Sequence, residues 1–264
     1  MNNPLEQLST RARRGSKPRC HLLTHGSPDA VAARLTALVA PFASVDTGDR
    51  WMPEGFDDLE EAQLHKAPRF LTRALSTQLG EWWLPAARQD AMTPNFDIAS
   101  TCMIDGVPGL LLVEAKAHEL ELAKESAGRK VTEHDSVERK ESHATIGAAI
   151  ESARSGLEAA TRLEWRISRD SHYQMSNRFA WSWKLTELGI PVVLVYLGFL
   201  KADDMSKSGE LPFPDAASWE TLVKAHSASL FPEEVWRQKW SVNGVPLIPL
   251  IRSLDVSLNE VALA

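Results

Sequence analysis

Three charged residues interrupt an otherwise apolar part of the chain, the stretch NFDIASTCMIDGVPGLLLVEAKAHEL that runs from residue 95 to residue 120. Asp97 and Glu114 are carboxylates, and Lys116 follows Glu114 by two positions. Two carboxylates held side by side repel each other unless a proton or a cation lies between them. Mg²⁺ satisfies such a pair well, because it binds protein carboxylates together with water and phosphate oxygens. A lysine beside that ion suits metal-assisted phosphodiester hydrolysis, where it stabilises the attacking oxygen or the charge on phosphorus.

The local sequence predicts that these residues meet, because Asp105-Gly106 is a two-residue hairpin turn between two strand-like runs. Counting back from that turn places Asp97 directly opposite Glu114, with their Cβ atoms about 4.5–5.5 Å apart. Lys116 projects from the same face as Glu114, because side chains alternate along a strand. A four-residue turn would instead place Asp97 opposite Lys116, which keeps the cluster but changes its pairing.

The same trio is also compatible with an ordinary cross-strand salt bridge, in which Lys116 neutralises both carboxylates on a half-exposed face. The spacing Glu-x-Lys is weak evidence by itself, because it should occur by chance roughly once in a chain of this size. A second copy, at residues 138–140, lies in a charged segment without a strand, and we interpret it as a solvated helical face. The first copy differs in its apolar strand and in the aspartate on the partner strand.

The surrounding sequence predicts a mixed sheet with helices packed on it. Helices are expected over 28–42 with Ser27 as N-cap, over 57–84 with a break near Pro68, and over 144–161, 171–188 and 218–230. Strands are expected over 20–24, on both sides of the hairpin turn, over 190–200, and over 242–251, where Pro246 and Pro249 favour a sheet edge. The segment 117–143 carries 12 Asp, Glu, Lys and Arg residues, a density that predicts a solvated flap or helix.

Composition limits the classes of protein that the chain can be. Its 264 residues suit one large α/β domain or one domain with an appended lobe, and no apolar run is long enough to cross a membrane. The start of the chain lacks the apolar core of a secretory signal, and Cys20 and Cys102 form no disulfide framework, so we expect a cytoplasmic protein with no membrane partner. The net charge of −6 argues against a surface that grips nucleic acid throughout, although residues 1–20 carry a balance of +4 that suits a phosphate-binding arm or a solvated tail.

The order of elements and charges resembles the PD-(D/E)XK nuclease superfamily, whose fold is called restriction-endonuclease-like. Its pattern is a helix, a strand bearing Asp, a strand bearing Glu-x-Lys, a further helix and a further strand. Here these are the helix that ends near Leu84, the strands NFDIAS and LLLVEAKA, the helix 171–188 and the strand PVVLVYLGF. The chain departs from the pattern at the residue before Asp97, which is Phe96 instead of proline.

The resemblance implies an α/β protein with a restriction-endonuclease-like core, in which a mixed β-sheet is flanked by helices, and with an N-terminal helical extension. It divides the chain into a flexible basic arm at 1–20, an extension packed on the core at 21–68 and a nuclease core at 69–264. Asp97, Glu114 and the backbone carbonyl of Ala115 would bind the metal, and Lys116 would be the catalytic lysine.

Two further positions are similar to features of that superfamily. Many members carry an acidic residue on the helix before the Asp strand, and Glu81 would be its counterpart and a further metal ligand, unless it is a solvated helix glutamate. Many exonuclease-like members carry a glutamine on a later helix, and Gln174 would be that catalytic residue, orienting the lysine or the water.

The resemblance therefore implies a Mg²⁺-dependent nuclease, with Mn²⁺ able to substitute, whose partner is nucleic acid and whose favoured substrate is DNA. It also allows a homodimer. The alternative is a non-catalytic nucleic-acid-binding or protein-interaction module on the same fold, which the acidic net charge favours.

Overall fold

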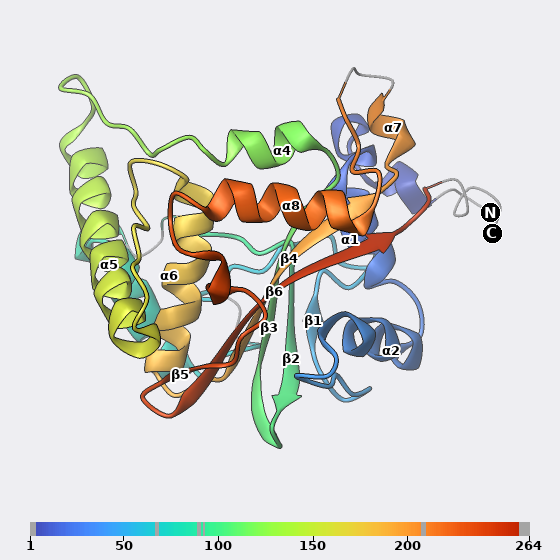
Figure 1. Ribbon diagram of the computed structural model, residues 1–264, viewed down its shortest axis with the longest axis horizontal. Helices are drawn as coiled ribbons and strands as arrows, with labels where there is room; N and C mark the ends of the chain where they lie inside the picture. Colours follow the sequence, from blue (N-terminus) through green and yellow to red (C-terminus); the bar gives the residue numbers. More distant parts are fainter. Residues whose placement is uncertain (1–3, 67–68, 89–90, 92, 207–209, 259–264) are drawn as a thin grey trace.

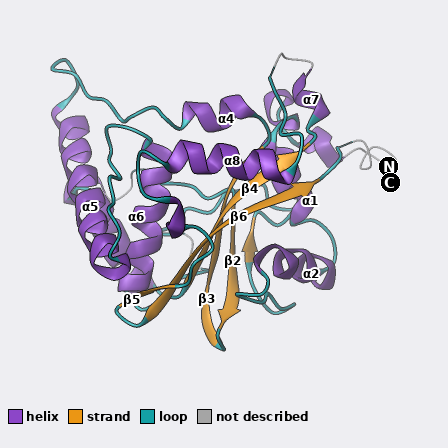
Figure 2. Ribbon diagram, in the orientation of Figure 1, coloured by secondary structure: helices purple, strands orange, loops and turns teal. Residues whose placement is uncertain are grey.

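The computed structural model describes residues 4–66, 69–88, 91, 93–206 and 210–258. They form a mixed six-stranded sheet in the order β1-β2-β3-β4-β6-β5, with helices on both faces (Figures 1 and 2). The strands are β1 (Trp51–Met52), β2 (Ile98–Ile104), β3 (Val107–Lys116), β4 (Val192–Leu200), β5 (Trp240–Val242) and β6 (Val245–Asp255). Strands β3, β4 and β6 are parallel, and the other pairings are antiparallel. The predicted α/β class with a mixed sheet flanked by helices is confirmed.

Two apolar cores lie on the two faces of the sheet, as the apolar run at residues 110–113 of β3 requires. Leu111 and Val113 pack with α1 (Ser16–Leu23) and α2 (Pro28–Val39) on one face. Leu110 and Leu112 pack on the other face with α3 (Arg73–Trp83), α5 (Val137–Thr161), α6 (Tyr173–Glu187) and α8 (Ala216–Ser227). The short helices are α4 (Glu119–Lys124) and α7 (Asp203–Ser206), with 3₁₀ turns at Pro4–Gln7, Thr10–Arg13, Ala86–Arg88 and Glu233–Val235.

The β2–β3 hairpin has the predicted turn and register. Asp105 and Gly106 both adopt left-handed backbone angles, with φ of 51° and 78°, as a two-residue turn of this kind requires. The ladder runs from the turn to the pair of Ile98 with Val113. Asp97 lies one residue beyond that pair, and its N–H donates to the Val113 carbonyl at 3.0 Å. The geometry that was expected to bring the charged residues together is therefore present.

The described part of residues 1–20, for which a flexible basic arm was expected, forms two 3₁₀ turns and the start of helix α1. Helix α1 begins at Ser16 and ends at Leu23, so the strand expected over 20–24 is wrong. Arg19 is 2% exposed and forms an ion pair with Asp204 at 2.5 Å, and Lys17 forms one with Glu61 at 2.8 Å. These cations bind acids of the same protein, and their pairing explains why the segment is ordered against the domain instead of extending toward a phosphate backbone.

Two helix boundaries differ from the prediction. Residues 57–66 form turns and isolated bridges instead of helix, and α3 begins after its N-cap Thr72, while Pro68 lies outside the described residues. Helix α5 begins at Val137, because Ser136 caps it by accepting a hydrogen bond from the Arg139 N–H. The charged segment 117–143 thus contains α4 and the first two turns of α5. By contrast, α2 begins at Pro28 after the predicted N-cap Ser27.

Strand β6 is not at the edge of the sheet, although it contains two prolines. It lies between β4 and β5, and the short strand β5 is the edge. The Pro249 carbonyl accepts from the Arg237 N–H at 2.8 Å. Because the N and C=O of a strand residue point to the same side, the Pro249 nitrogen also points away from β4. Its missing N–H therefore removes no bond from the β4–β6 ladder.

Candidate functional site

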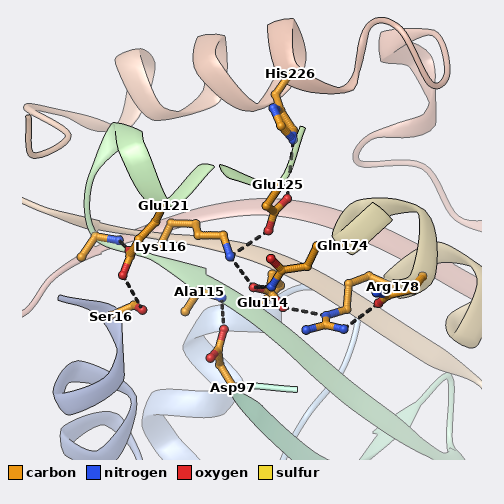
Figure 3. Close-up of polar contacts among 12 residues, drawn as sticks. Ser16, Asp97, Glu114, Ala115, Lys116, Glu121, Glu125, Gln174, Arg178 and His226 are labelled. Carbon is orange, nitrogen blue, oxygen red and sulfur yellow. Dashed lines mark hydrogen bonds and ion pairs between the residues drawn. The ribbon is translucent and has the colours of Figure 1, made fainter. Parts of the chain in front are cut away.

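Glu114 and Lys116 lie at the carboxyl end of β3, beside Tyr196 and Gly198 of the parallel strand β4. Three other elements meet there: the end of α4, the first half of α6 and the last turn of α8 (Figure 3). Gly198 allows α8 to approach closely, because a Cβ at this position would lie 2.5 Å from the Trp219 ring. The site is thus a layer of polar side chains enclosed between the sheet and three helices.

Glu114 is 1% exposed and accepts hydrogen bonds from three side chains. Gln174 donates from Nε2 to Oε1 at 2.6 Å, Arg178 donates from Nε to Oε2 at 2.6 Å, and Lys116 donates from Nζ to Oε1. Gln174 and Arg178 both reach Glu114 because residues four apart lie on the same face of a helix. Both carboxylate oxygens are therefore engaged, and two of the three donors are cations.

Lys116 lies between two buried carboxylates, since its Nζ is also 2.7 Å from Oε1 of Glu125. Glu125 directly follows α4, is 2% exposed, and has His226 of α8 on its other side, with His226 Nε2 3.6 Å from Glu125 Oε2. Burial alone would lower the pKa of Lys116, but the charges of Glu114 and Glu125 outweigh it and raise the pKa above its ordinary value. Lys116 is consequently a firmly held cation.

Asp97 is half-buried, and its Oδ2 accepts from the Ala115 N–H at 2.7 Å. Within the described residues Asp97 forms no salt bridge, in contrast to Glu114. Burial, together with the negative charge of Glu114, holds the pKa of Asp97 well above its ordinary value. Asp97 is thus the carboxylate of the cluster that has no cationic partner.

The structure brings most of the predicted site residues together, but not all of them. Asp97, Glu114, Lys116 and Gln174 come together, and Ala115 enters the cluster through its backbone (Figure 3).

Glu81 is exposed on α3 and lies outside this cluster. Its neighbour Trp83 packs against Trp181, seven residues along α6 from Gln174 and hence about 10 Å away along the helix axis. Of the two roles considered for Glu81, metal ligand and solvated helix glutamate, the second matches its exposed position.

Sequence reasoning missed three members of the cluster: Glu125, Arg178 and His226. Arg178 had a usable signal, because it follows the predicted residue Gln174 by one helical turn. Glu125 had none, because it belongs to a segment whose charge density predicted solvent exposure. Only the packing of α4 under α8 buries it, with Leu122 anchoring α4 in the core.

A cleft of about 520 Å³ opens beside the start of β2. Asn95 lines it two residues before Asp97 and donates from Nδ2 to Glu61 at 3.3 Å. Its other charged lining residues are Lys17, Lys66, Arg69, Asp58 and Glu60. Cations and acids are balanced in number, so this cleft is polar without being strongly basic.

The negative charge of the cluster suits a hard divalent cation. The arrangement of its carboxylates suits such an ion only in part. In the described portion of the chain, no group of three or more His, Cys, Asp and Glu side chains is arranged to hold a metal ion. Asp97 lacks a cation, whereas Glu114 already has two, so Lys116 or Arg178 would have to release an oxygen. Three carboxylates face two cations in the cluster, and the excess of negative charge favours one further cation.

Comparisons with protein-family models, with curated proteins and with solved structures return no match to this chain. The resemblance to the PD-(D/E)XK superfamily therefore rests on the sequence pattern. None of the helices described here is both long and apolar enough to span a bilayer.

Proposed function

We propose that the protein is a Mg²⁺-dependent nuclease with a restriction-endonuclease-like core, acting on DNA. The observation that carries this proposal is the convergence of Asp97, Glu114, Lys116 and Gln174 from three elements at one end of the sheet. The sequence pattern selects these four residues for phosphodiester hydrolysis, and their proximity is what that chemistry requires.

Asp97, Glu114 and the carbonyl of Ala115 would hold the ion. When bound, Mg²⁺ supplies a Lewis acid that polarises the phosphate and makes a water molecule more acidic, and Mn²⁺ can take its place. Lys116 stabilises the negative charge that develops on the phosphate oxygens, because it is a buried cation and its field is weakly screened. Gln174 holds Glu114 in place through its hydrogen bond, which is a narrower role than orienting the lysine or the water.

The charges of the cluster agree with this assignment. When Asp97 is ionised, the carboxylates of Asp97, Glu114 and Glu125 carry one more charge than Lys116 and Arg178 can neutralise, and burial makes that excess costly. A bound divalent cation would reverse the sign of that excess charge. A phosphodiester, with its single negative charge, then brings the site to neutrality.

The test is hydrolysis of single- and double-stranded DNA with Mg²⁺ or Mn²⁺. We expect activity from the wild type, a loss on the order of 10²–10³-fold in Lys116→Ala and Asp97→Ala, and no change in Glu81→Gln. Equal activity in all four proteins, or activity in none, would overturn the proposal.

One observation favours the alternative of a non-catalytic module. Lys116 and Arg178 together neutralise Glu114, so the cluster is nearly self-sufficient without a metal. Calorimetric titration with Mn²⁺ separates the two functions, because a module with a purely structural cluster would bind no ion.

A further inference from the structure

Glu125 has spare capacity for a cation. Its Oε1 lies 2.7 Å from Lys116 Nζ and its Oε2 lies 3.6 Å from His226 Nε2, but neither oxygen has a well-directed hydrogen bond. Glu114, in contrast, is engaged on both oxygens by three donors. Buried carboxylates normally accept several hydrogen bonds, so Glu125 can accept a well-directed one from the nearby Lys116 ammonium.

The fold holds the Glu125 carboxylate beside the Lys116 ammonium. Glu125 is 2% exposed although Lys124 and Ser126 on either side of it are exposed. His226 lies beyond it (Figure 3). The His226 ring packs edge-on against His172 with the ring centroids 4.7 Å apart. Elements α4 and α8 therefore hold one carboxylate at the far side of the Lys116 ammonium from Glu114.

The Glu114 carboxylate cannot hydrogen-bond to Lys116 and bind a divalent cation with the same oxygens at the same time. If its oxygens turned toward an ion, Lys116 would lose one of its two anionic partners while remaining buried. A buried ammonium without a partner is unstable, and it would also be free to leave the reacting phosphate.

We infer that Glu125 is a positioning residue, which takes over the Lys116 ammonium when Glu114 binds the cation. This inference rests on the proposed function, because it concerns the same site. Before the cation binds, the Lys116 ammonium lies between Glu114 and Glu125. Afterwards it forms a well-directed hydrogen bond to Glu125 alone. His226 keeps the Glu125 carboxylate aimed at Lys116 from the other side.

The kinetic test compares Glu125→Gln, Glu125→Asp and the control Glu133→Gln, which removes an exposed carboxylate from the same segment. We expect kcat to fall about 10–100-fold in Glu125→Gln with KM unchanged, partial rescue in Glu125→Asp, and no effect of the control. Unchanged kcat in folded Glu125→Gln would overturn the inference. An equal rise of KM in both Glu125 variants would do the same, because it indicates altered binding instead of a positioned lysine.

A second readout does not depend on activity. The Lys116 ammonium gives a separate ¹⁵N NMR signal only while its protons exchange slowly with water, which requires that carboxylates hold it. In Glu114→Gln we expect the signal to persist, and in Glu114→Gln/Glu125→Gln we expect it to disappear. Loss of the signal already in Glu114→Gln, or its survival in the double variant, would contradict the role of Glu125. If DNA is not hydrolysed at all, the proposed function fails while this measurement still reports on Glu125.

Discussion

Arg178 of α6 donates from Nε to Oε2 of Glu114 on β3 at 2.6 Å, and its guanidinium lies 4.9 Å above the ring of Phe96. A cation of the protein therefore occupies the carboxylate that would bind a metal ion. Arg178 is also 5% exposed, so this pair is shielded from solvent and from salt. On the proposed function, a divalent cation would have to compete with Arg178 for this carboxylate.

Removing that competitor should strengthen metal binding. In Arg178→Gln we expect Mn²⁺ to bind roughly tenfold more tightly, a change of about 1.4 kcal/mol. Calorimetric titration measures this affinity directly. Arg154→Gln is the matched control, because it breaks a surface Arg–Glu pair on α5. Unchanged or weaker Mn²⁺ binding in Arg178→Gln would show that Arg178 supports the metal-binding geometry of Glu114 instead of opposing it.

Glu114 should be far more important for stability than Glu81. Glu114→Gln leaves Lys116 and Arg178 buried with one anion fewer, and we expect the free energy of unfolding to fall by about 3–5 kcal/mol. Glu81→Gln changes an exposed carboxylate and should stay within about 0.5 kcal/mol of the wild type. Urea unfolding in the presence of EDTA compares the two. Similar losses in both variants would mean that Glu114 is not a buried ion-pair partner.

Asp97 should make the free energy of unfolding fall as pH rises. Its pKa in the folded state is raised above the ordinary value of 3.8, so its contribution to stability is present at low pH and is lost as pH rises through the folded-state pKa. Asp97→Asn cannot ionise and keeps an oxygen for the Ala115 N–H. In EDTA, the variant should therefore gain stability relative to the wild type as pH rises from 3.8 toward the folded-state pKa of Asp97. A difference that is constant with pH, or that shrinks, would refute the raised pKa.

Gly198 should be intolerant of a side chain, because it pairs with Lys116 across β3 and β4 under the Trp219 ring. We expect Gly198→Ala to cost about 1–3 kcal/mol of stability through overpacking, and to weaken DNA hydrolysis by displacing α8. Gly48→Ala is the control, because a Cβ there meets no atom within 4 Å. Thermal unfolding that is unchanged in Gly198→Ala would show that α8 packs less closely than described.

Patterns that act within a few residues of the chain were enough to predict the centre of the fold. The Asp105-Gly106 turn fixed the β2–β3 register, because a two-residue turn leaves one pairing for every later position. The same local signals identified α2 through its Ser27 cap and β4 through its apolar run. Consequently Asp97, Glu114 and Lys116 could be brought together from the sequence alone.

Features that depend on distant partners could not be predicted in this way. Arg19 became buried through Asp204, which is 185 residues away, so the first 20 residues could not be distinguished from a free arm. Glu125 became buried through α8, and its charged neighbours suggested solvent exposure. The Asp204 carboxylate compensates the burial of Arg19, and the Lys116 ammonium compensates the burial of Glu125, although composition alone predicts both burial costs to be prohibitive.

The most direct test of a cation bound by Asp97 and Glu114 is a crystal soaked in Mn²⁺ and measured at a wavelength where manganese scatters anomalously. We expect an anomalous peak with ligands from both carboxylates, and the Lys116 ammonium hydrogen-bonded to Glu125. The absence of a peak, with Lys116 and Arg178 still bound to Glu114, would contradict a metal-dependent reaction at this site and leave a self-neutralised cluster in its place.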